Sequence, residues 1–143
     1  DGIIVEGGHT LHGIEIDCGD TPDAVPALAV LGCYAQGKMK LYNVAASRMK
    51  ETDRTKTIAG ELRKMGAKID EEEDSITIYH SPLHGATIDG HQDHRIVMAT
   101  SCAALGAEGH SFIDSVSHVG VSFPRFYEEM KGIGANILRL AEK

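Results

Sequence analysis

The sequence "LHGIEID" at residues 11–17 returns as "LHGATID" at residues 83–89, 72 positions later. The segments 33–44 and 103–116, each an apolar stretch followed by a glycine and a strand-like run, match at the same interval. Self-similarity at a fixed period is typical of a protein built from copies of one supersecondary unit. We therefore predict that the chain holds two copies of one unit.

The first copy, residues 11–80, predicts the element order β-α-β-α-β-β. Alternating runs predict strands, apolar or amphipathic runs that end near a glycine predict helices, and "SITIYH" predicts the return strand of a hairpin. The expected elements are a strand at 13–17, a helix at Ala24–Gln36, a strand at Lys38–Val44, a helix at Thr52–Met65 and a hairpin of 67–73 with 75–80.

The second copy, residues 83–143, predicts the same order and is cut short at Lys143. Gly37 and Gly109, which the repeat aligns, are expected at the C-cap of the first helix of each copy. The expected elements are a strand at 85–89, a helix at Arg95–Glu108, a strand at Ser111–Val116, a helix at Phe123–Ile133 and a strand that begins with "ANI" at 135–137.

The fold class that these patterns predict is mixed α/β (α+β). The helix that begins at Ala24 is apolar nearly all round, so we expect it to be buried between other elements. Two units would leave that interior poorly covered, and the chain begins at Asp1 without a methionine. We therefore expect a fragment, with a further unit of the same domain outside it.

The composition is that of an ordinary globular protein, with 42% hydrophobic and 24% charged residues. A net charge of −7 and 5% aromatic residues argue against nucleic-acid binding, which needs a basic face and stacking rings. Three cysteines without a CxxC pair predict buried, reduced thiols in a cytoplasmic protein. Neither a membrane span nor a signal peptide is expected.

The stretch "SRMKETDR" at residues 47–54 concentrates cations where a helix is expected to start. Free N–H groups and the positive end of the helix dipole favour anions there, and Lys50 and Arg54 lie about one helical turn apart. Glu51, a carboxylate among these cations, suits proton transfer. The alternative, which spacing alone favours, is that Glu51 and Asp53 complement the dipole while the cations are solvated.

Asp23, in "GDTPDAV" at residues 19–25, lies between a strand end and the apolar helix. A lone carboxylate in this position is usually an N-cap, and this is the interpretation that the local pattern favours. The alternative is a general base at the rim of a cleft, whose pKa partial burial raises toward a useful value.

The matching place in the second copy carries "HQDHRIVMA" at residues 91–99. His91, Asp93 and His94 invite a metal-site interpretation, but their spacing fits no common zinc pattern, and we expect no metal. Arg95 at a helix start opposes the helix dipole, which indicates that it serves a ligand. The repeat places Asp23 and Arg95 at equivalent positions, so these loops are expected to line one rim of a cleft.

Three segments closely resemble, in order and spacing, the 5-enolpyruvylshikimate-3-phosphate synthases, the target of glyphosate. They are "PDAVPALAVLGCYAQGKMKLYNVAASRMKETDR", "GHQDHRIVMA" and "VSFPRFYEEM". The resemblance covers essentially the whole chain. It implies a two-domain fold in which each domain has three β-α-β-α-β-β units. The chain would hold the last two units of the C-terminal domain, without the opposite domain.

The resemblance also implies a transferase of the shikimate pathway, which serves aromatic amino acid biosynthesis, with phosphoenolpyruvate and shikimate 3-phosphate as substrates. It implies a monomer, no cofactor, and a cytoplasmic location. Asp23 matches the acceptor of the proton from the 5-hydroxyl, Glu51 the donor to the methylene carbon, and Lys50 a substrate-binding lysine near both. Arg54 and Arg95 match the pair that holds the carboxylate of phosphoenolpyruvate, and His94 lies beside them.

Two positions depart from the pattern of many members of the family. No lysine stands near Val121, where many bacterial members bind phosphate, and Ala46 replaces a polar substrate contact.

Two other functions remain alternatives. One is the sister enzyme that acts on UDP-N-acetylglucosamine, although it lacks "KETDR". The other is a non-catalytic β-α repeat module that binds RNA or protein.

Overall fold

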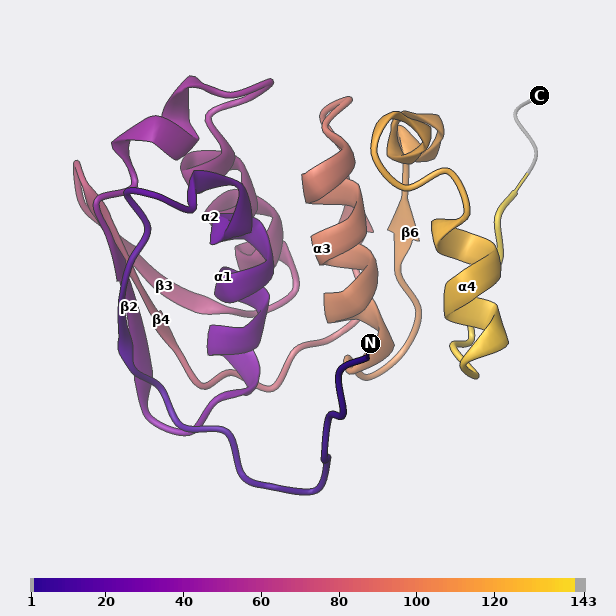
Figure 1. Ribbon diagram of the computed structural model, residues 1–143, viewed down its shortest axis with the longest axis horizontal. Coiled ribbons are helices and arrows are strands. Elements are labelled where there is room, and N and C mark those ends of the chain that lie inside the picture. The colour runs from indigo at the N-terminus through magenta and orange to yellow at the C-terminus, as the bar shows by residue number, and fades with distance from the viewer. Residues whose placement is uncertain (1, 141–143) are drawn as a thin grey trace.

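The computed structural model describes residues 2–140 and confirms the predicted alternation of strands and helices (Figure 1). Short 3-10 turns precede three of the helices, at Pro22–Ala24, Ala45–Met49 and Val116–Val121. The elements are β1 (Glu15–Asp17), α1 (Val25–Tyr34), β2 (Lys38–Tyr42), α2 (Arg54–Lys64), β3 (Lys68–Glu71), β4 (Ser75–Tyr79), β5 (Thr87–Ile88), α3 (His94–Leu105), β6 (Phe112–Ile113) and α4 (Phe126–Gly132).

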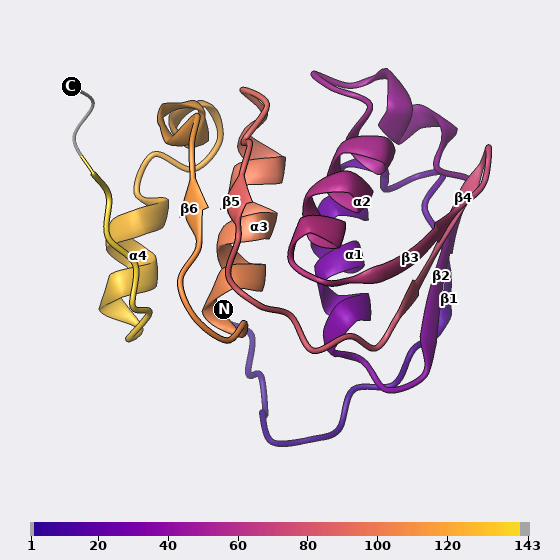
Figure 2. The same ribbon diagram turned by 180° about the vertical axis from the view of Figure 1, so that it is seen from behind.

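The strands form a four-stranded sheet in the order β1-β2-β4-β3 and a pair β5-β6. β1 and β2 are parallel, β4 is antiparallel to both of its neighbours, and the hairpin β3–β4 is confirmed. Figures 1 and 2 show α1 and α2 on one face of the large sheet and α3 beyond them, with β6 between α3 and α4 in both views. No helix within residues 2–140 has the length and apolar character needed to cross a membrane.

The two copies share their strand register as well as their sequence. Ile16 lies opposite Leu41 in the parallel pair β1-β2, and Ile88 lies opposite Ile113 in β5-β6, so both partners are shifted by the interval of the repeat. An isolated bridge precedes each pair, joining His12 to Gln36 in one copy and His84 to Glu108 in the other. The interval of 72 therefore describes a repeated backbone arrangement.

The glycine of the repeated "LHG" is required by close backbone contact. A Cβ atom on Gly13 would lie 2.0 Å from the carbonyl oxygen of Lys38, and one on Gly85 would lie 2.1 Å from that of His110. Any side chain at either position would therefore push the parallel strands apart. This contact explains why the motif is the best-preserved part of the repeat.

The C-cap prediction for Gly37 and Gly109 is wrong, because α1 and α3 end before them, at the C-caps Ala35 and Gly106. Both glycines have positive φ, 83° and 88°, in the turn that leads to the next strand. Two further glycines, Gly66 and Gly134, follow α2 and α4 and end them in a defined motif. In both, the glycine N–H bonds the carbonyl three residues earlier and the next N–H bonds the carbonyl five residues earlier, which is a Schellman motif.

The strand predicted at "ANI" (135–137) is also wrong, since residues 135–140 form no strand. The equivalent β3 pairs only with β4, and the described residues after 134 include no second run that could supply such a partner. A strand without a neighbour leaves its backbone groups without ladder hydrogen bonds.

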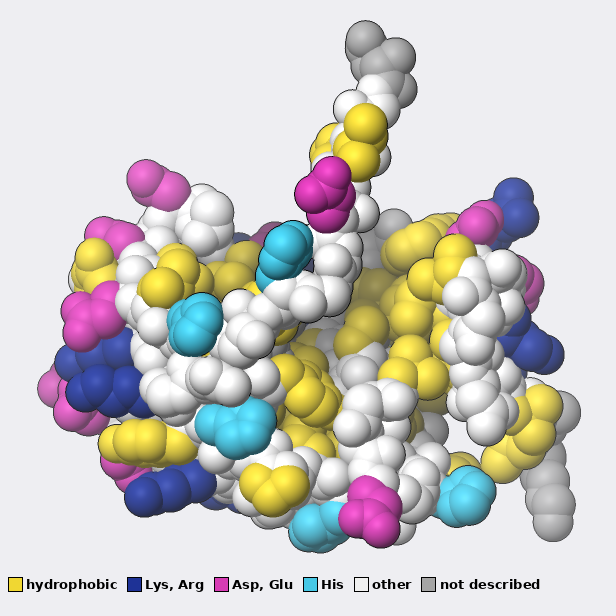
Figure 3. Space-filling model, turned by 90° about the horizontal axis from the view of Figure 1, so that it is seen from below, with side chains coloured by type: hydrophobic (Ala, Val, Ile, Leu, Met, Phe, Trp, Pro, Cys, Tyr) yellow, Lys and Arg dark blue, Asp and Glu magenta, His cyan; other side chains and the backbone are white. Residues whose placement is uncertain are grey.

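A single core joins the sheet, α1, α2 and α3, and a smaller cluster around Phe126 and Tyr127 holds α4 against α3. The helix α1 is buried where it packs on the sheet, α2 and α3, whereas Leu31 is 44% exposed on the remaining, open side. Seen from below, the molecule has a hollow lined by hydrophobic side chains (Figure 3). The prediction that α1 is buried therefore holds except on the side that carries Leu31.

The cysteines follow the prediction in part. Cys18 and Cys33 are free and buried, and burial raises the pKa of the Cys33 thiol to about 12. Cys102 is free but exposed, so the expectation of burial is wrong for this residue.

Candidate active site

Asp23 lies in the 3-10 turn that leads from β1 into α1. The favoured interpretation of Asp23 as an N-cap is wrong, because Ala24 occupies the N-cap of α1 and no side chain caps the helix. The Asp23 carboxylate instead pairs with three cations. Its Oδ1 lies 2.8 Å from Nη1 of Arg54 and 3.3 Å from Nζ of Lys50, and its Oδ2 lies 3.1 Å from Nη2 of Arg95.

The cation-rich stretch before α2 divides its carboxylates between two tasks. Asp53 is the N-cap of α2, because its carboxylate accepts a hydrogen bond of 3.0 Å from the Lys56 N–H. Glu51 accepts no helix N–H and pairs with the Arg54 guanidinium. The interpretation as a charge-balanced helix start therefore holds for Asp53 and is wrong for Glu51. It is also wrong for Arg54, whose side chain is only 1% exposed.

The Arg54 guanidinium donates two hydrogen bonds to Asp93, which is fully buried. Nε of Arg54 donates to Oδ2 of Asp93 at 2.7 Å, and Nη2 donates to Oδ1 at 3.2 Å. Asp93 is also the N-cap of α3, since it accepts from the Arg95 N–H at 2.9 Å, and Thr52 donates to it at 3.2 Å. One buried carboxylate therefore fixes the orientation of Arg54 and the start of the helix that carries Arg95.

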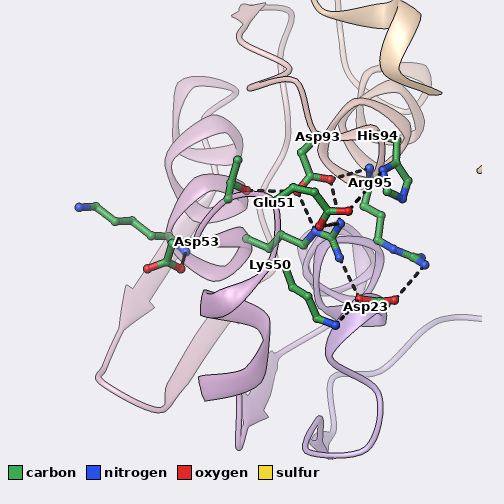
Figure 4. A network of polar contacts seen from close by, with 10 residues as sticks. Asp23, Lys50, Glu51, Asp53, Asp93, His94 and Arg95 are labelled. Atoms are coloured by element: carbon green, nitrogen blue, oxygen red, sulfur yellow. Dashed lines mark hydrogen bonds and ion pairs between the residues drawn. The ribbon is translucent and has the colours of Figure 1, made fainter. Parts of the chain in front are cut away.

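The remaining predicted residue, His94, is 7% exposed on the first turn of α3. Its Nδ1 lies 4.0 Å from Oε1 of Glu51, which is close enough for an ion pair but too long for a hydrogen bond. Figure 4 shows the whole arrangement, in which side chains from the turn before α1, the loop before α2 and the start of α3 point toward one another. All six residues singled out from the sequence lie in this one network: Asp23, Lys50, Glu51, Arg54, His94 and Arg95.

The residue that sequence reasoning missed is Asp93, which it treated only as a candidate metal ligand. An aspartate directly before an apolar helix is a recognisable N-cap signal, but nothing local indicates its pairing with Arg54, 39 positions away. The histidines beside it have other partners, His91 with Glu61 and His94 with Glu51. Within residues 2–140 no group of acidic, histidine or cysteine side chains is arranged to hold a metal ion.

The electrostatics of Asp23 differ from the expectation. Burial raises the pKa of the Asp23 carboxyl, but the hydrogen bond from Lys50 and the charges of Arg95 and Arg54 outweigh it and hold that pKa below its usual value. The predicted upward shift is therefore wrong. Burial also raises the pKa of Asp93, and the hydrogen bonds from Arg54 and the Arg95 amide likewise reverse the shift.

Acid is expected to destabilise the chain through these carboxyls. Because the pKa values of Asp23 and Asp93 are lower in the folded chain than in the unfolded one, their stabilising effect is complete above the unfolded value of about 4 and is lost as the pH falls through the folded values. Urea unfolding followed by circular dichroism should show a midpoint that falls between about pH 5 and pH 3. A constant midpoint over that range would contradict the assignment.

Comparison with known proteins gives a consistent result. The family described as "EPSP synthase (3-phosphoshikimate 1-carboxyvinyltransferase)" matches residues 1–130. Among curated proteins, the 3-phosphoshikimate 1-carboxyvinyltransferases of Methanocella arvoryzae and Methanocaldococcus jannaschii are 48% and 47% identical, over 94% and 96% of this chain. The chain spans 32% of the length of each of these relatives.

Solved structures give the same result. The EPSP synthase of Acinetobacter baumannii matches with a TM-score of 0.81 and 35% identity, over 88% of this chain and 31% of that one. The enolpyruvyl transferase NikO of Streptomyces tendae matches with a TM-score of 0.75 over 94% of this chain and 30% of that one; at 22% identity it supports the fold alone.

Proposed function

Since the chain belongs to the EPSP synthase family, we propose that it forms part of an enzyme that moves the enolpyruvyl group of phosphoenolpyruvate to the 5-hydroxyl of shikimate 3-phosphate. The observation that carries the proposal is the convergence of Arg54, Arg95 and Lys50 on a single carboxylate. This is the arrangement that a carboxylate substrate requires. It lies at an exposed rim, because the Asp23 side chain is 45% exposed.

The chain supplies one wall of the proposed site. Residues 11–80 and 83–143 are two of the three units of one domain. Two observations support a further unit: the open side of α1 at Leu31, and the lack of a partner strand among the described residues after 134. The opposite wall belongs to the other domain, since the chain spans about a third of its relatives.

The reaction assigns a role to each residue of the network. Arg54 and Arg95 hold the carboxylate of phosphoenolpyruvate, and Lys50 contacts the substrates between the acid and the base. Asp23 takes the proton of the 5-hydroxyl as its oxygen attacks the substituted carbon of phosphoenolpyruvate. Glu51 donates a proton to the methylene carbon, which becomes a methyl group.

The tetrahedral intermediate that results returns a proton from this methyl group to the Glu51 carboxylate and breaks its bond to phosphate, so the enolpyruvyl double bond is restored and phosphate leaves. Holding two reactants in register supplies roughly 7–11 kcal/mol of the barrier reduction in favourable cases. His94 is 7% exposed beside Glu51, where it orients that carboxylate or shields it from water.

The substrate carboxylate and Asp23 compete for the same cations. While it pairs with Lys50 and the two arginines, Asp23 is a poor base, because these cations hold its pKa low. Binding of phosphoenolpyruvate draws the arginines to the substrate and leaves Asp23 with fewer cations. The base therefore gains strength only when the substrate that needs it is bound.

A chimaera tests the proposal directly. In it, this chain replaces the matching third of the Methanocella arvoryzae relative, which is 48% identical over the exchanged region. We expect the chimaera to release phosphate from phosphoenolpyruvate with shikimate 3-phosphate, and the isolated chain to release none. UDP-N-acetylglucosamine is the control acceptor. Turnover only with the nucleotide sugar, or a folded chimaera without turnover, would overturn the proposal.

A further inference from the structure

Glu61 is an almost fully buried carboxylate, 4% exposed, that lies outside the network described above. Its Oε1 lies 2.9 Å from Nε2 of His91, and its Oε2 accepts the Asp89 N–H at 3.1 Å. Lys64 donates to both oxygens, at 2.8 and 2.7 Å. Two of these three partners belong to the loop before α3, so Glu61 joins the first copy of the repeat to the second.

The loop that Glu61 holds has a costly backbone. His91 and Gln92 are consecutive non-glycine residues with φ of 51° and 55°, in the left-handed region. Such conformations persist only where the surroundings hold them, and they concentrate at functional sites. A side-chain contact is therefore needed beside them, and the Glu61–His91 pair supplies it.

The same helix, α2, holds the loop at both of its ends. Glu61 follows Arg54 by two helical turns, so both side chains leave the same face of α2. Glu61 binds the start of the loop, at Asp89 and His91, whereas Arg54 binds its end, at Asp93. The residues directly after the loop are His94 and Arg95.

We propose that Glu61 and His91 are a positioning pair that fixes the loop 89–93 on α2. The pair thereby positions Asp93, which orients Arg54, and Arg95, so that both arginines can bind the carboxylate of phosphoenolpyruvate. The inference rests on the proposed function for its substrate. It needs no contact between the pair and the substrate. Its effect is transmitted through the register of the loop on α2.

The test begins with the chain alone, where no reaction is required. Glu61→Gln keeps the shape of the side chain and removes the charge that His91 and Asp89 contact. We expect the Asp89 amide to exchange its hydrogen about tenfold faster by nuclear magnetic resonance, and the Arg95 guanidinium resonance to shift. Lys64→Gln is the matched control, because it removes a partner of Glu61 that is not in the loop. It should leave both signals nearly unchanged.

In the chimaera, Glu61→Gln should raise the KM for phosphoenolpyruvate about tenfold and change kcat less than about threefold. The variant displaces the arginines that bind the substrate carboxylate and leaves the acid and the base in place. His91→Asn separates contact from conformation. Asparagine tolerates positive φ but cannot reach Glu61, so the variant should resemble Glu61→Gln. Adding Gln92→Gly to Glu61→Gln should restore part of the KM, because glycine adopts this conformation readily.

An unchanged Asp89 amide in Glu61→Gln overturns the inference, and so does faster exchange without a change in KM. Equal effects of Glu61→Gln and Lys64→Gln overturn it too, because they assign the effect to the end of α2. If the unmodified chimaera has no turnover, the proposed function fails. The positioning role is then decided by the Arg95 resonance of the chain alone, which must shift in Glu61→Gln and stay in Lys64→Gln.

Discussion

Asp23→Asn is expected to move two measurements in opposite directions. In the isolated chain, the affinity for phosphoenolpyruvate should rise about tenfold, or about 1.4 kcal/mol, because three partly exposed ion pairs no longer compete with the ligand. In the chimaera, kcat should fall by about 10²–10⁴, because the general base is lost. Isothermal titration calorimetry measures the first effect and a coupled phosphate-release assay the second.

The control for this prediction is Asp20→Asn. It makes the same change in net charge three positions earlier, on an exposed residue that forms no ion pair with the described residues. Affinity and turnover should both stay within about twofold of the unmodified protein. If both variants raised the affinity for phosphoenolpyruvate equally, the effect would come from the change in net charge and not from Asp23. Undiminished turnover in Asp23→Asn would remove Asp23 from the role of base.

The opposite movements follow from what the site does without a ligand. A carboxylate that neutralises Lys50, Arg54 and Arg95 keeps these cations together at the rim, where their mutual repulsion would otherwise separate them. The cost is a weaker apparent affinity for the substrate carboxylate. Asp23, which the sequence offers as a candidate base, therefore also pairs with the cations that we propose for the substrate carboxylate.

The sequence predicted the fold well where the signal is local or repeated. The repeat predicted strands at 13–17 and 85–89, where β1 and β5 lie, and the same glycine contact recurs beside both. The prediction failed at residues 135–137, where a strand pattern has no partner among the described residues. Local patterns report what a segment favours, and whether a neighbour is available is a property of the whole fold.

The site was less accessible to local reasoning. The local pattern favoured a helix cap for Asp23 and kept a general base as the alternative, and the family resemblance favoured the base. Asp93 and Glu61 were missed because their partners, Arg54 and His91, lie 39 and 30 positions away. No pattern within one helix or loop indicates such a pair. The buried residues that orient the network can thus be identified only from the three-dimensional structure.

Asp93→Ala is expected to be the most destabilising single substitution at the site. It leaves the Arg54 guanidinium, 1% exposed, without its buried partner, and removing one member of a buried ion pair costs about 3–5 kcal/mol. Urea unfolding at neutral pH should show a midpoint lower by about 2 M, if the slope is near the usual 2 kcal/mol per molar. The start of α3 also loses its N-cap.

Asp53→Ala is the matched control, because Asp53 caps α2 as Asp93 caps α3, but its side chain is 35% exposed. The loss of a cap costs about 1 kcal/mol, so a similar loss in both variants would show that Asp93 acts only as a cap.

The decisive variant is Asp93→Ala combined with Arg54→Met, which removes the stranded charge together with its partner. If the cost comes from the Arg54 guanidinium left without its buried partner Asp93, the double variant is more stable than the sum of the two single losses predicts, because a buried ion pair can be replaced by apolar groups at little cost. Strict additivity would mean that the pair does not couple the two copies of the repeat.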